Sequence, residues 1–264
     1  MTDTTKPNGP IRVAVIGAAG RTGSRIIALA DQDDRFTVDA ALEVAGHDRV
    51  GERVAGIAID DALPANADVL IDFSLPQGTV DWAKWAISAN VPMVIGTTGH
   101  DDAQLAAIRR AAEKVAVLKA TNMSVGVNVL WRLAREAASL LGDAFDIEIV
   151  EAHHRYKVDA PSGTAITLLE SVCEGAGLDP AQAAVYGRQG ETGARPAGQV
   201  GVHALRIGDT VGRHEAHFGG LGETLTLTHT AQTRDIFARG ALRAAEWIVT
   251  RPPGLYSMQD VLFG

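Results

Sequence analysis

A basic cluster between positions 151 and 164 is the densest group of side chains that could do chemistry in this chain of 264 residues. The stretch reads EAHHRYKVDAPSGT, and it places four basic residues close together, namely His153, His154, Arg155 and Lys157. An imidazole titrates near neutral pH and can give or take a proton, and an ammonium group can stabilise developing negative charge. The cluster therefore predicts proton transfer to a small anionic substrate.

A helix start signal follows this cluster directly. Pro161 and Ser162 precede an apolar helical pattern, and Thr164 adds a second hydroxyl group. Because a helix N-terminus offers unpaired N–H groups and a positive dipole, this start predicts a site for a carboxylate. The alternative is a solvent-facing loop before a capped helix, which explains Ser162 but not the paired histidines beside a lysine.

Zinc binding is a second alternative for these histidines. His153 and His154 are adjacent on an expected strand, so they point to opposite faces and do not readily share one metal. The segment from His214 to His217 is one residue short of the zinc-protease pattern and lies in a strand-like stretch. No metal is therefore expected, and ordinary polar positions are expected for His47, His100, His203 and His229.

A glycine-rich turn near the N-terminus predicts a dinucleotide site. Glycines occupy the first, fourth and seventh places of the segment Gly17-Ala18-Ala19-Gly20-Arg21-Thr22-Gly23, directly after an apolar strand. Such glycines let the backbone approach a pyrophosphate at the start of the next helix. Glu43 ends the second strand, about 20 residues after the last glycine, where an acid binds ribose hydroxyls. A plain strand-to-helix turn and a solvated strand end are the alternatives.

The choice between NADH and NADPH is left open by these residues. Glu43 favours NADH because a carboxylate repels a 2′-phosphate, and Val44 brings no positive charge. Arg21 lies within the turn and could reach a phosphate. Gly96, Thr97 and Thr98 end another strand on the side where such sheets bind ligands, so they are expected either to face the nicotinamide ribose or to form a turn.

The elements that must position these residues fall into two patterns. In the first half, strands at 11–17, 36–43, 67–74 and 91–99 and an apolar run at 115–122 alternate with helices. This alternation predicts a doubly wound parallel sheet of the Rossmann type. After residue 122 come a helix, a strand at 144–154, a second helix and strand-like runs at 200–207, 210–218 and 223–230. Glycine turns at 208–209 and 219–222 suit hairpins, so a smaller α+β domain with a mostly antiparallel sheet is expected.

Composition excludes several classes of protein. Hydrophobic residues make up 46% and charged residues 21%, as in ordinary globular proteins, and the net charge of −8 argues against nucleic acid or an anionic membrane as a partner. No apolar run approaches the roughly 20 residues of a membrane span, and the leader MTDTTKPNGP lacks the apolar stretch of a signal peptide. A cytoplasmic location is expected. The lone cysteine, Cys173, is expected to be buried.

At these motifs the sequence resembles the 4-hydroxy-tetrahydrodipicolinate reductase family, also called dihydrodipicolinate reductase, of lysine and diaminopimelate biosynthesis. The likeness rests on the motif E-x-H-H-x-x-K-x-D-x-P-S-G-T at 151–164, the glycine turn, Asp72-Phe73-Ser74, Gly96-Thr97-Thr98-Gly99, Asn122-Met123-Ser124 and the pattern from Arg234 to Ala241. It covers nearly the whole chain. Two positions differ from many members of the family. Val44 stands where many of them carry an arginine, and Met123 stands before Ser124, where an aromatic residue is often found.

The resemblance implies a role for each matching residue. His153 would be the proton donor with Lys157 as its partner, and the substrate would be bound by His154, Ser162, Gly163 and Thr164. The cofactor, NADH or NADPH, would contact the glycine turn, Glu43, the 96–98 segment and a further set: Phe73, Thr121, Asn122, Met123 and Arg234. The final helix would fold back, so residues 1–124 and 234–264 would bind the dinucleotide. Residues 125–233 would bind substrate and build a homotetramer.

The expected reaction is hydride transfer to a cyclic imine with two carboxylates, giving tetrahydrodipicolinate, with a hinge that closes on the substrate. Two rival interpretations stay open at this point. One is a reductase of another oxo or imino acid on the same two-domain plan. The other is a dinucleotide sensor without turnover, which the intact His153, Lys157 and Thr164 disfavour. The residues do not distinguish whether the hydroxylated precursor loses water on the enzyme.

Overall fold

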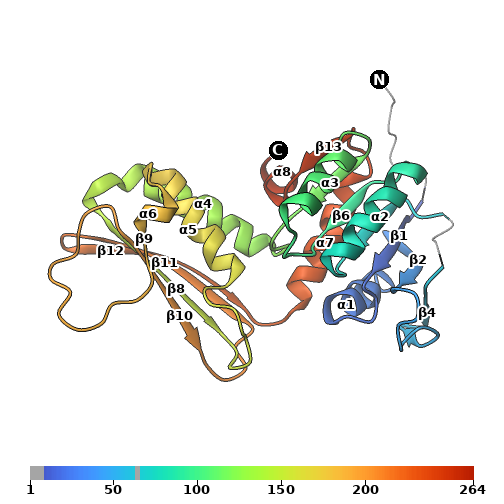
Figure 1. The fold of residues 1–264 in the computed structure, drawn as a ribbon, viewed down its shortest axis with the longest axis horizontal. Helices are drawn as coiled ribbons and strands as arrows, with labels where there is room; N and C mark the ends of the chain where they lie inside the picture. Colours follow the sequence, from blue (N-terminus) through green and yellow to red (C-terminus); the bar gives the residue numbers. More distant parts are fainter. Residues whose placement is uncertain (1–8, 63–65) are drawn as a thin grey trace. The chain divides into compact units, whose positions relative to one another are not determined.

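The computed structural model describes residues 9–62 and 66–264 (Figure 1). The chain divides into two compact units, one of Met1–Val125 with Asp235–Gly264 and one of Gly126–Arg234. The ranges expected from the sequence, 1–124 with 234–264 and 125–233, differ from these units by one residue at each boundary. Residues 1–8, most of the leader in which no signal peptide is expected, lie outside the described residues.

The first unit is built on an eight-stranded sheet with the order β13-β7-β6-β5-β1-β2-β4-β3. Its strands pair in parallel except for the antiparallel β3 and β4. The strands are β1 (Ile11–Ile16), β2 (Phe36–Leu42), β3 (Arg53–Val54), β4 (Ile57–Asp60), β5 (Val69–Asp72), β6 (Met93–Ile95), β7 (Ala116–Lys119) and β13 (Gly254–Tyr256). The predicted doubly wound parallel sheet is confirmed.

Helices cover both faces of this sheet, as the alternation along β1 shows. Val13 and Val15 belong to a core cluster with residues of α1 (Arg21–Ala30) and α7 (Asp235–Ile248). Ala14 and Ile16 belong to a second cluster with residues of α2 (Pro76–Ala89) and α3 (Asp102–Ala112). Successive strand residues point to opposite faces, so β1 is buried on both sides. Its end, where the glycine turn begins, is therefore held firmly in the middle of the sheet.

The final helices return to the first unit. α7 packs against α1 and against the strands β5, β6 and β7, and it is followed by β13 and by α8 (Met258–Phe263). Gly240 in α7 lies so close to the backbone of Met123 that a Cβ there would overlap the Met123 carbonyl oxygen. This close approach gives a physical reason for the glycine of the Arg234-to-Ala241 pattern.

The second unit carries a five-stranded sheet with the order β12-β11-β8-β10-β9. β11 pairs antiparallel with both β8 and β12, and β10 pairs in parallel with β8 and β9. The elements are α4 (Val125–Leu141), the short 3-10 turn η1 (Gly142–Ala144), β8 (Asp146–His153), α5 (Gly163–Ala176), α6 (Pro180–Ala183), β9 (Ala184–Val185), β10 (Val200–Arg206), β11 (Gly212–Gly220) and β12 (Glu223–Ala231). The predicted α+β organisation is confirmed.

One predicted connection is wrong. The turn at Gly208 and Asp209 does not make a hairpin, because β8 lies between β10 and β11 and pairs with both. A local turn signal says that the chain reverses, but it does not say which strand supplies the hydrogen bonds. The turn at 220–223, in contrast, joins β11 and β12 as an antiparallel pair, as expected.

The core of the second unit forms between one face of its sheet and the helices α4 and α5. Ile147 and Ile149 of β8 and Phe218 of β11 pack against apolar residues of both helices. Cys173 of α5 is buried in the same cluster, and burial together with the nearby Asp179 raises the pKa of its thiol to about 11. The expectation that Cys173 is a buried residue is confirmed.

Candidate active site

The glycine turn of the first unit can be built only with glycine at two of its places. Gly17 has a φ of +78°, and a Cβ there would also overlap the carbonyl oxygen of Phe73. A Cβ at Gly23 would overlap the carbonyl oxygen of Gly17, since α1 packs directly on the turn. The turn is thus tight, and its backbone is bare enough for a ligand to approach closely.

The first turn of α1 provides a place for an anion. Its N-cap residue is Gly20, which has no side chain to accept hydrogen bonds from the helix amides. The first helical residues are Arg21, Thr22 and Gly23, and the Arg21 side chain is exposed. An uncapped helix start with a bare glycine backbone fits the pyrophosphate of a dinucleotide.

Glu43 is hydrogen-bonded to the glycine turn. Its Oε1 accepts a hydrogen bond of 2.9 Å from the backbone N–H of Ala19. Both residues line a pocket of about 780 Å³ together with Gly17, Gly20, Val44 and Phe73. Ala18, in contrast, is fully buried and packs into the core behind the turn. The structure therefore brings the predicted ribose-binding acid to the predicted phosphate-binding turn.

The pocket also contains side chains that the motifs did not point to. His47 lines it, as do Arg49 from the loop after β2 and two tryptophans of α2, Trp82 and Trp85. The Arg49 guanidinium donates to the Ala19 carbonyl oxygen at 2.7 Å and to Glu52 at 2.7 Å. The spacing of three residues between the tryptophans on a helix could have predicted that both face the same pocket. Arg49 lies in a loop where no sequence motif marks it.

The predicted 96–98 segment is arranged around a buried aspartate. Asp72, at the end of β5, is fully buried and accepts hydrogen bonds from Ser74, Thr79 and Thr97. The Thr97 hydroxyl is thereby used inside the protein, while Thr98 is exposed. Gly96 lies under the Phe73 ring, where any Cβ would overlap it. This network fixes the ends of β5 and β6 beside the start of α2.

The remaining predicted cofactor residues lie in different places. Met123 is almost fully buried in the core of the first unit, so its thioether packs among apolar residues of the core. Asn122 accepts a hydrogen bond of 2.8 Å from the N–H of Ser124, and Thr121 is exposed. Arg234 is the last residue of the second unit, directly before α7. Thr121, Asn122 and Met123 are not among the residues that line the pocket beside the glycine turn.

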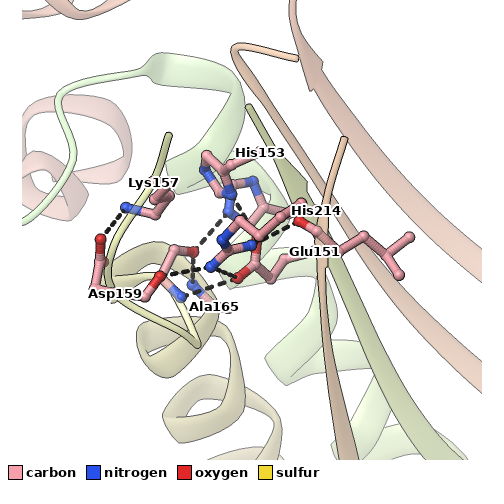
Figure 2. A network of polar contacts seen from close by, with 9 residues as sticks. Glu151, His153, Lys157, Asp159, Ala165 and His214 are labelled. Atoms are coloured by element: carbon pink, nitrogen blue, oxygen red, sulfur yellow. Dashed lines mark hydrogen bonds and ion pairs between the residues drawn. The ribbon is translucent and has the colours of Figure 1, made fainter. Parts of the chain in front are cut away.

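In the second unit, Glu151 and His153 end the buried face of β8. Alternate residues of this strand face the helices, beginning with Ile147 and Ile149 and continuing to Glu151 and His153. The Nδ1 atom of His153 lies 2.5 Å from Oε2 of Glu151. The imidazole is mostly buried, with 11% of its side chain exposed. Figure 2 shows these side chains gathered near the start of α5.

The start of α5 lies beside this pair. Ser162 is the N-cap, and its Oγ accepts from the N–H of Ala165 at 3.2 Å. Its own N–H donates to Oε1 of Glu151 at 3.1 Å. Apart from its chain neighbours and the backbone of its own helix, no described atom lies within 4 Å of the place that a Cβ on Gly163 would occupy, so the backbone there is open to a ligand. The helix start that the sequence predicted is confirmed.

The loop between β8 and α5 carries the other basic residues. Lys157 has 21% of its side chain exposed, and its Nζ donates to Asp159 at 2.8 Å (Figure 2). The neighbouring His154 is half-buried, and its backbone carbonyl accepts from the N–H of Lys157. The predicted group of His153, Lys157, Ser162 and Gly163 thus lies on one strand end, one loop and one helix start.

Two residues of this site were missed by the sequence analysis. His214 of β11 is 3% exposed, stacks edge-on against the His153 ring with 5.1 Å between the centroids, and has its Nε2 atom 3.2 Å from Oγ of Ser162. Burial, and then the nearby His153, lowers the pKa of His214 to about 3. Arg206 of β10 donates to both carboxylate oxygens of Glu151. Both residues come from strands more than 50 positions away from Glu151.

Within residues 9–62 and 66–264, no group of three or more histidine, cysteine, aspartate or glutamate side chains is arranged to hold a metal ion. Over the same residues, no helix is both long enough and apolar enough to pass through a membrane.

Known proteins resemble this chain along nearly its full length. Residues 11–123 match the family model described as dihydrodipicolinate reductase, N-terminus, and residues 126–262 match the one described as dihydrodipicolinate reductase, C-terminus. A 4-hydroxy-tetrahydrodipicolinate reductase of Thiobacillus denitrificans is 47% identical over 262 residues, which cover 96% of this chain and 98% of the relative. One of Halorhodospira halophila is 45% identical over 261 residues, with 95% and 98% covered.

A solved structure has the same fold. It is described as dipicolinate-bound dihydrodipicolinate reductase from Paenisporosarcina sp. TG-14, with a TM-score of 0.72, 24% identity, and coverage of 96% of this chain and all of that one. These matches confirm the resemblance carried by the glycine turn and by the 151–164 motif. With both halves matched and almost half of all residues identical to a relative, the chain belongs to the dihydrodipicolinate reductase family.

Proposed function

We propose that this protein uses NADH or NADPH to reduce dihydrodipicolinate, formed by loss of water from 4-hydroxy-tetrahydrodipicolinate, to tetrahydrodipicolinate in lysine and diaminopimelate biosynthesis. The observation that carries this proposal is the buried pair of Glu151 and His153 beside the open start of α5, in a chain of this family. A proton donor next to a carboxylate-binding helix start is what reduction of a cyclic dicarboxylate requires.

The first unit is the dinucleotide-binding unit in this proposal. The bare backbone at Gly17 and Gly20 and the uncapped start of α1 hold the pyrophosphate, and Glu43 accepts from ribose hydroxyls. The pocket of about 780 Å³ beside them has the size of a cofactor site. When bound, the reduced nicotinamide dinucleotide supplies a hydride.

The second unit binds and protonates the substrate in this proposal. Gly163 and Thr164 at the start of α5 hold one substrate carboxylate through the backbone and the threonine hydroxyl, and His154 contacts the substrate. The Ser162 hydroxyl caps the helix and so keeps this start in place.

His153 completes the reduction by giving a proton. Hydride addition at one ring carbon makes an electron-rich enamine, and the Nε2 atom of His153 supplies the proton that this enamine takes up. One hydride and one proton together account for the two hydrogens gained by the product. Lys157 stabilises the negative charge that develops on the substrate.

Two further properties belong to this proposal. The protein acts in the cytoplasm, where a biosynthetic reductase finds its reduced cofactor. It works as a homotetramer built through the sheet of the second unit, one face of which is free of the helices α4 and α5 that form the core on the other. Light scattering on the purified protein tests the tetramer, and a monomer mass at micromolar concentration would contradict it.

The proposed activity is tested by following the absorbance of NADH and of NADPH with freshly generated substrate. We expect oxidation of the cofactor that depends on this substrate, and no oxidation with other oxo or imino acids. Binding of either dinucleotide without any turnover would identify a sensor instead. Turnover of another imino acid alone would identify a different reductase.

A further inference from the structure

The Glu151 carboxylate is the most completely enclosed charged group of the second unit's site. It is 0% exposed and accepts four hydrogen bonds: from Nδ1 of His153, from the N–H of Ser162, and from Nη1 and Nη2 of Arg206 at 3.0 and 2.9 Å. Burying a charge is costly unless it is paired and hydrogen-bonded, and here both conditions are met. Such a group is kept inside a protein for a reason other than stability alone.

The same contacts determine its protonation state. Burial alone would raise the pKa of Glu151, but the hydrogen bonds from His153 and Arg206 outweigh it and lower this pKa to about 2. Glu151 is therefore ionised at neutral pH, and an ionised carboxylate only accepts hydrogen bonds. The hydrogen between it and His153 must then reside on Nδ1 of the imidazole.

The other groups around His153 leave its second nitrogen for the reaction. The Nε2 atom points toward Gly212, where a Cβ would lie 3.2 Å from it. His214, from β11, presents a ring edge and stays uncharged, because burial and the neighbouring His153 lower its pKa to about 3. Two further charged groups lie close by: Lys157 in the loop after β8, which contributes to the low pKa of His214, and Arg206 on β10, which donates to Glu151.

Arg206 lies on β10 and holds the Glu151 carboxylate beside His153. Beyond its two bonds to Glu151, its guanidinium donates to the carbonyl oxygens of Leu205 and Asp159, at 2.7 and 2.5 Å. Asp159 is also the partner of Lys157, so Arg206 links the buried carboxylate to the loop that carries the lysine. A planar guanidinium with this many donors fixes orientation in a way that a lysine does not.

We propose that Glu151, held by Arg206, is a positioning residue that keeps hydrogen on Nδ1 of His153 and stabilises the protonated ring, so that Nε2 delivers the proton. This inference rests on the proposed role of His153 as the proton donor. It gives a role to Glu151, to which the 151–164 motif had assigned none, and it adds Arg206 from outside that motif. A carboxylate that orients a histidine in this manner is known to affect rate much more than binding.

The same strand offers a matched control. Glu148 lies three residues before Glu151 and points to the opposite face of β8. Its carboxylate also contacts a histidine and arginines, namely His203 at 2.7 Å, Arg188 at 2.9 Å and Arg195 at 3.2 Å. The network is similar in chemistry, but it lies away from the start of α5.

The test compares the full-length variants Glu151→Gln, Arg206→Lys and Glu148→Gln with wild type. For Glu151→Gln we expect kcat to fall about 100-fold, with little change in KM or in nucleotide affinity. The kcat of Arg206→Lys should lie between those of wild type and Glu151→Gln, and Glu148→Gln should keep the wild-type kcat.

A second measurement does not depend on any variant of Glu151 being folded. Nitrogen NMR of histidine-labelled wild-type protein, with the His153 signal assigned by its loss in His153→Ala, reports which ring nitrogen carries hydrogen when the ring is neutral. We expect Nδ1, whereas hydrogen on Nε2 alone would overturn the inference. An unchanged kcat in folded Glu151→Gln would also overturn it. If His153→Ala itself kept full turnover, the proposed role of His153 would fail first.

Discussion

The two units of this protein build their sites from different materials. In the first unit the parts proposed to hold the dinucleotide pyrophosphate are backbone, namely the turn at Gly17 and Gly20 and the uncapped start of α1, beside one carboxylate held by the N–H of Ala19. In the second unit the chemistry lies in a side-chain network from β8, β10 and β11, with Glu151 at its centre. A backbone site suits a large cofactor that is bound in the same way in many enzymes. A side-chain network, in contrast, can direct a proton to one particular atom.

This difference predicts that changes in the two units affect different measured quantities. The largest effect is expected for His153→Ala, which removes the proposed proton donor. We expect kcat to fall by about 10² to 10⁴-fold, the usual contribution of a general acid, while nucleotide affinity stays unchanged. Steady-state kinetics and nucleotide titration measure both quantities.

His203→Ala is the matched control for this variant. His203 lies on β10 and pairs with Glu148, which points away from the start of α5. It should keep wild-type turnover. Equal losses in both histidine variants would mean that folding of the sheet, and not proton transfer, is what the substitutions disturb.

In the first unit the largest expected effect is that of Gly17→Ala. Gly17 has a φ of +78° and no space for a Cβ next to the Phe73 carbonyl. We expect a loss of about 1–3 kcal/mol in the free energy of unfolding, together with weaker binding of the dinucleotide. Urea unfolding and nucleotide titration are the measurements.

Gly46→Ala separates backbone strain from crowding. Gly46 has the same φ of +78°, but no described atom lies within 4 Å of the place its Cβ would take. This variant should lose only about 1 kcal/mol or so, the cost of the left-handed conformation. If Gly17→Ala were no worse than Gly46→Ala, the close approach of the turn to Phe73 would not matter.

A smaller effect is expected at Arg49, an arginine that lines the pocket of the first unit. Its guanidinium lies against the glycine turn, and its side chain is 41% exposed. A phosphate on the cofactor ribose would form charge-assisted hydrogen bonds with it. We expect Arg49→Ala to raise the KM for NADPH about tenfold while changing that for NADH little. Equal changes for both cofactors would assign Arg49 to support of the turn alone.

The smallest effect concerns acid stability in the second unit. Burial opposes ionisation of Glu148, but hydrogen bonds from Arg188 and His203 outweigh it and lower the pKa from 4.5 to about 2. The stability that this carboxylate contributes is therefore present above about pH 4.5 and is lost as the pH falls toward about 2. Glu148→Gln should unfold more easily at neutral pH and should lose less stability than wild type on acidification. Parallel curves of unfolding free energy against pH would contradict this expectation.

The sequence was informative where a site is local. The glycine spacing, the acid at the end of β2 and the helix start at Ser162 each lie within one or two elements, so their patterns could be interpreted directly. Strand alternation with helices predicted the parallel sheet for the same reason. The failure at Gly208 and Asp209 shows the limit, since a turn says nothing about a strand that inserts between its two arms.

The residue types at 17–23 and 151–164 by themselves predicted a dinucleotide site and a proton donor for a small anion, because glycine freedom and imidazole chemistry are properties of single residues and short spacings. Only the tertiary structure decided which groups surround the imidazole of His153 and the carboxylate of Glu151. Arg206 and His214 reach Glu151 and His153 from strands that are distant in sequence, and the low pKa of Glu151 exists only where folding has buried it among donors.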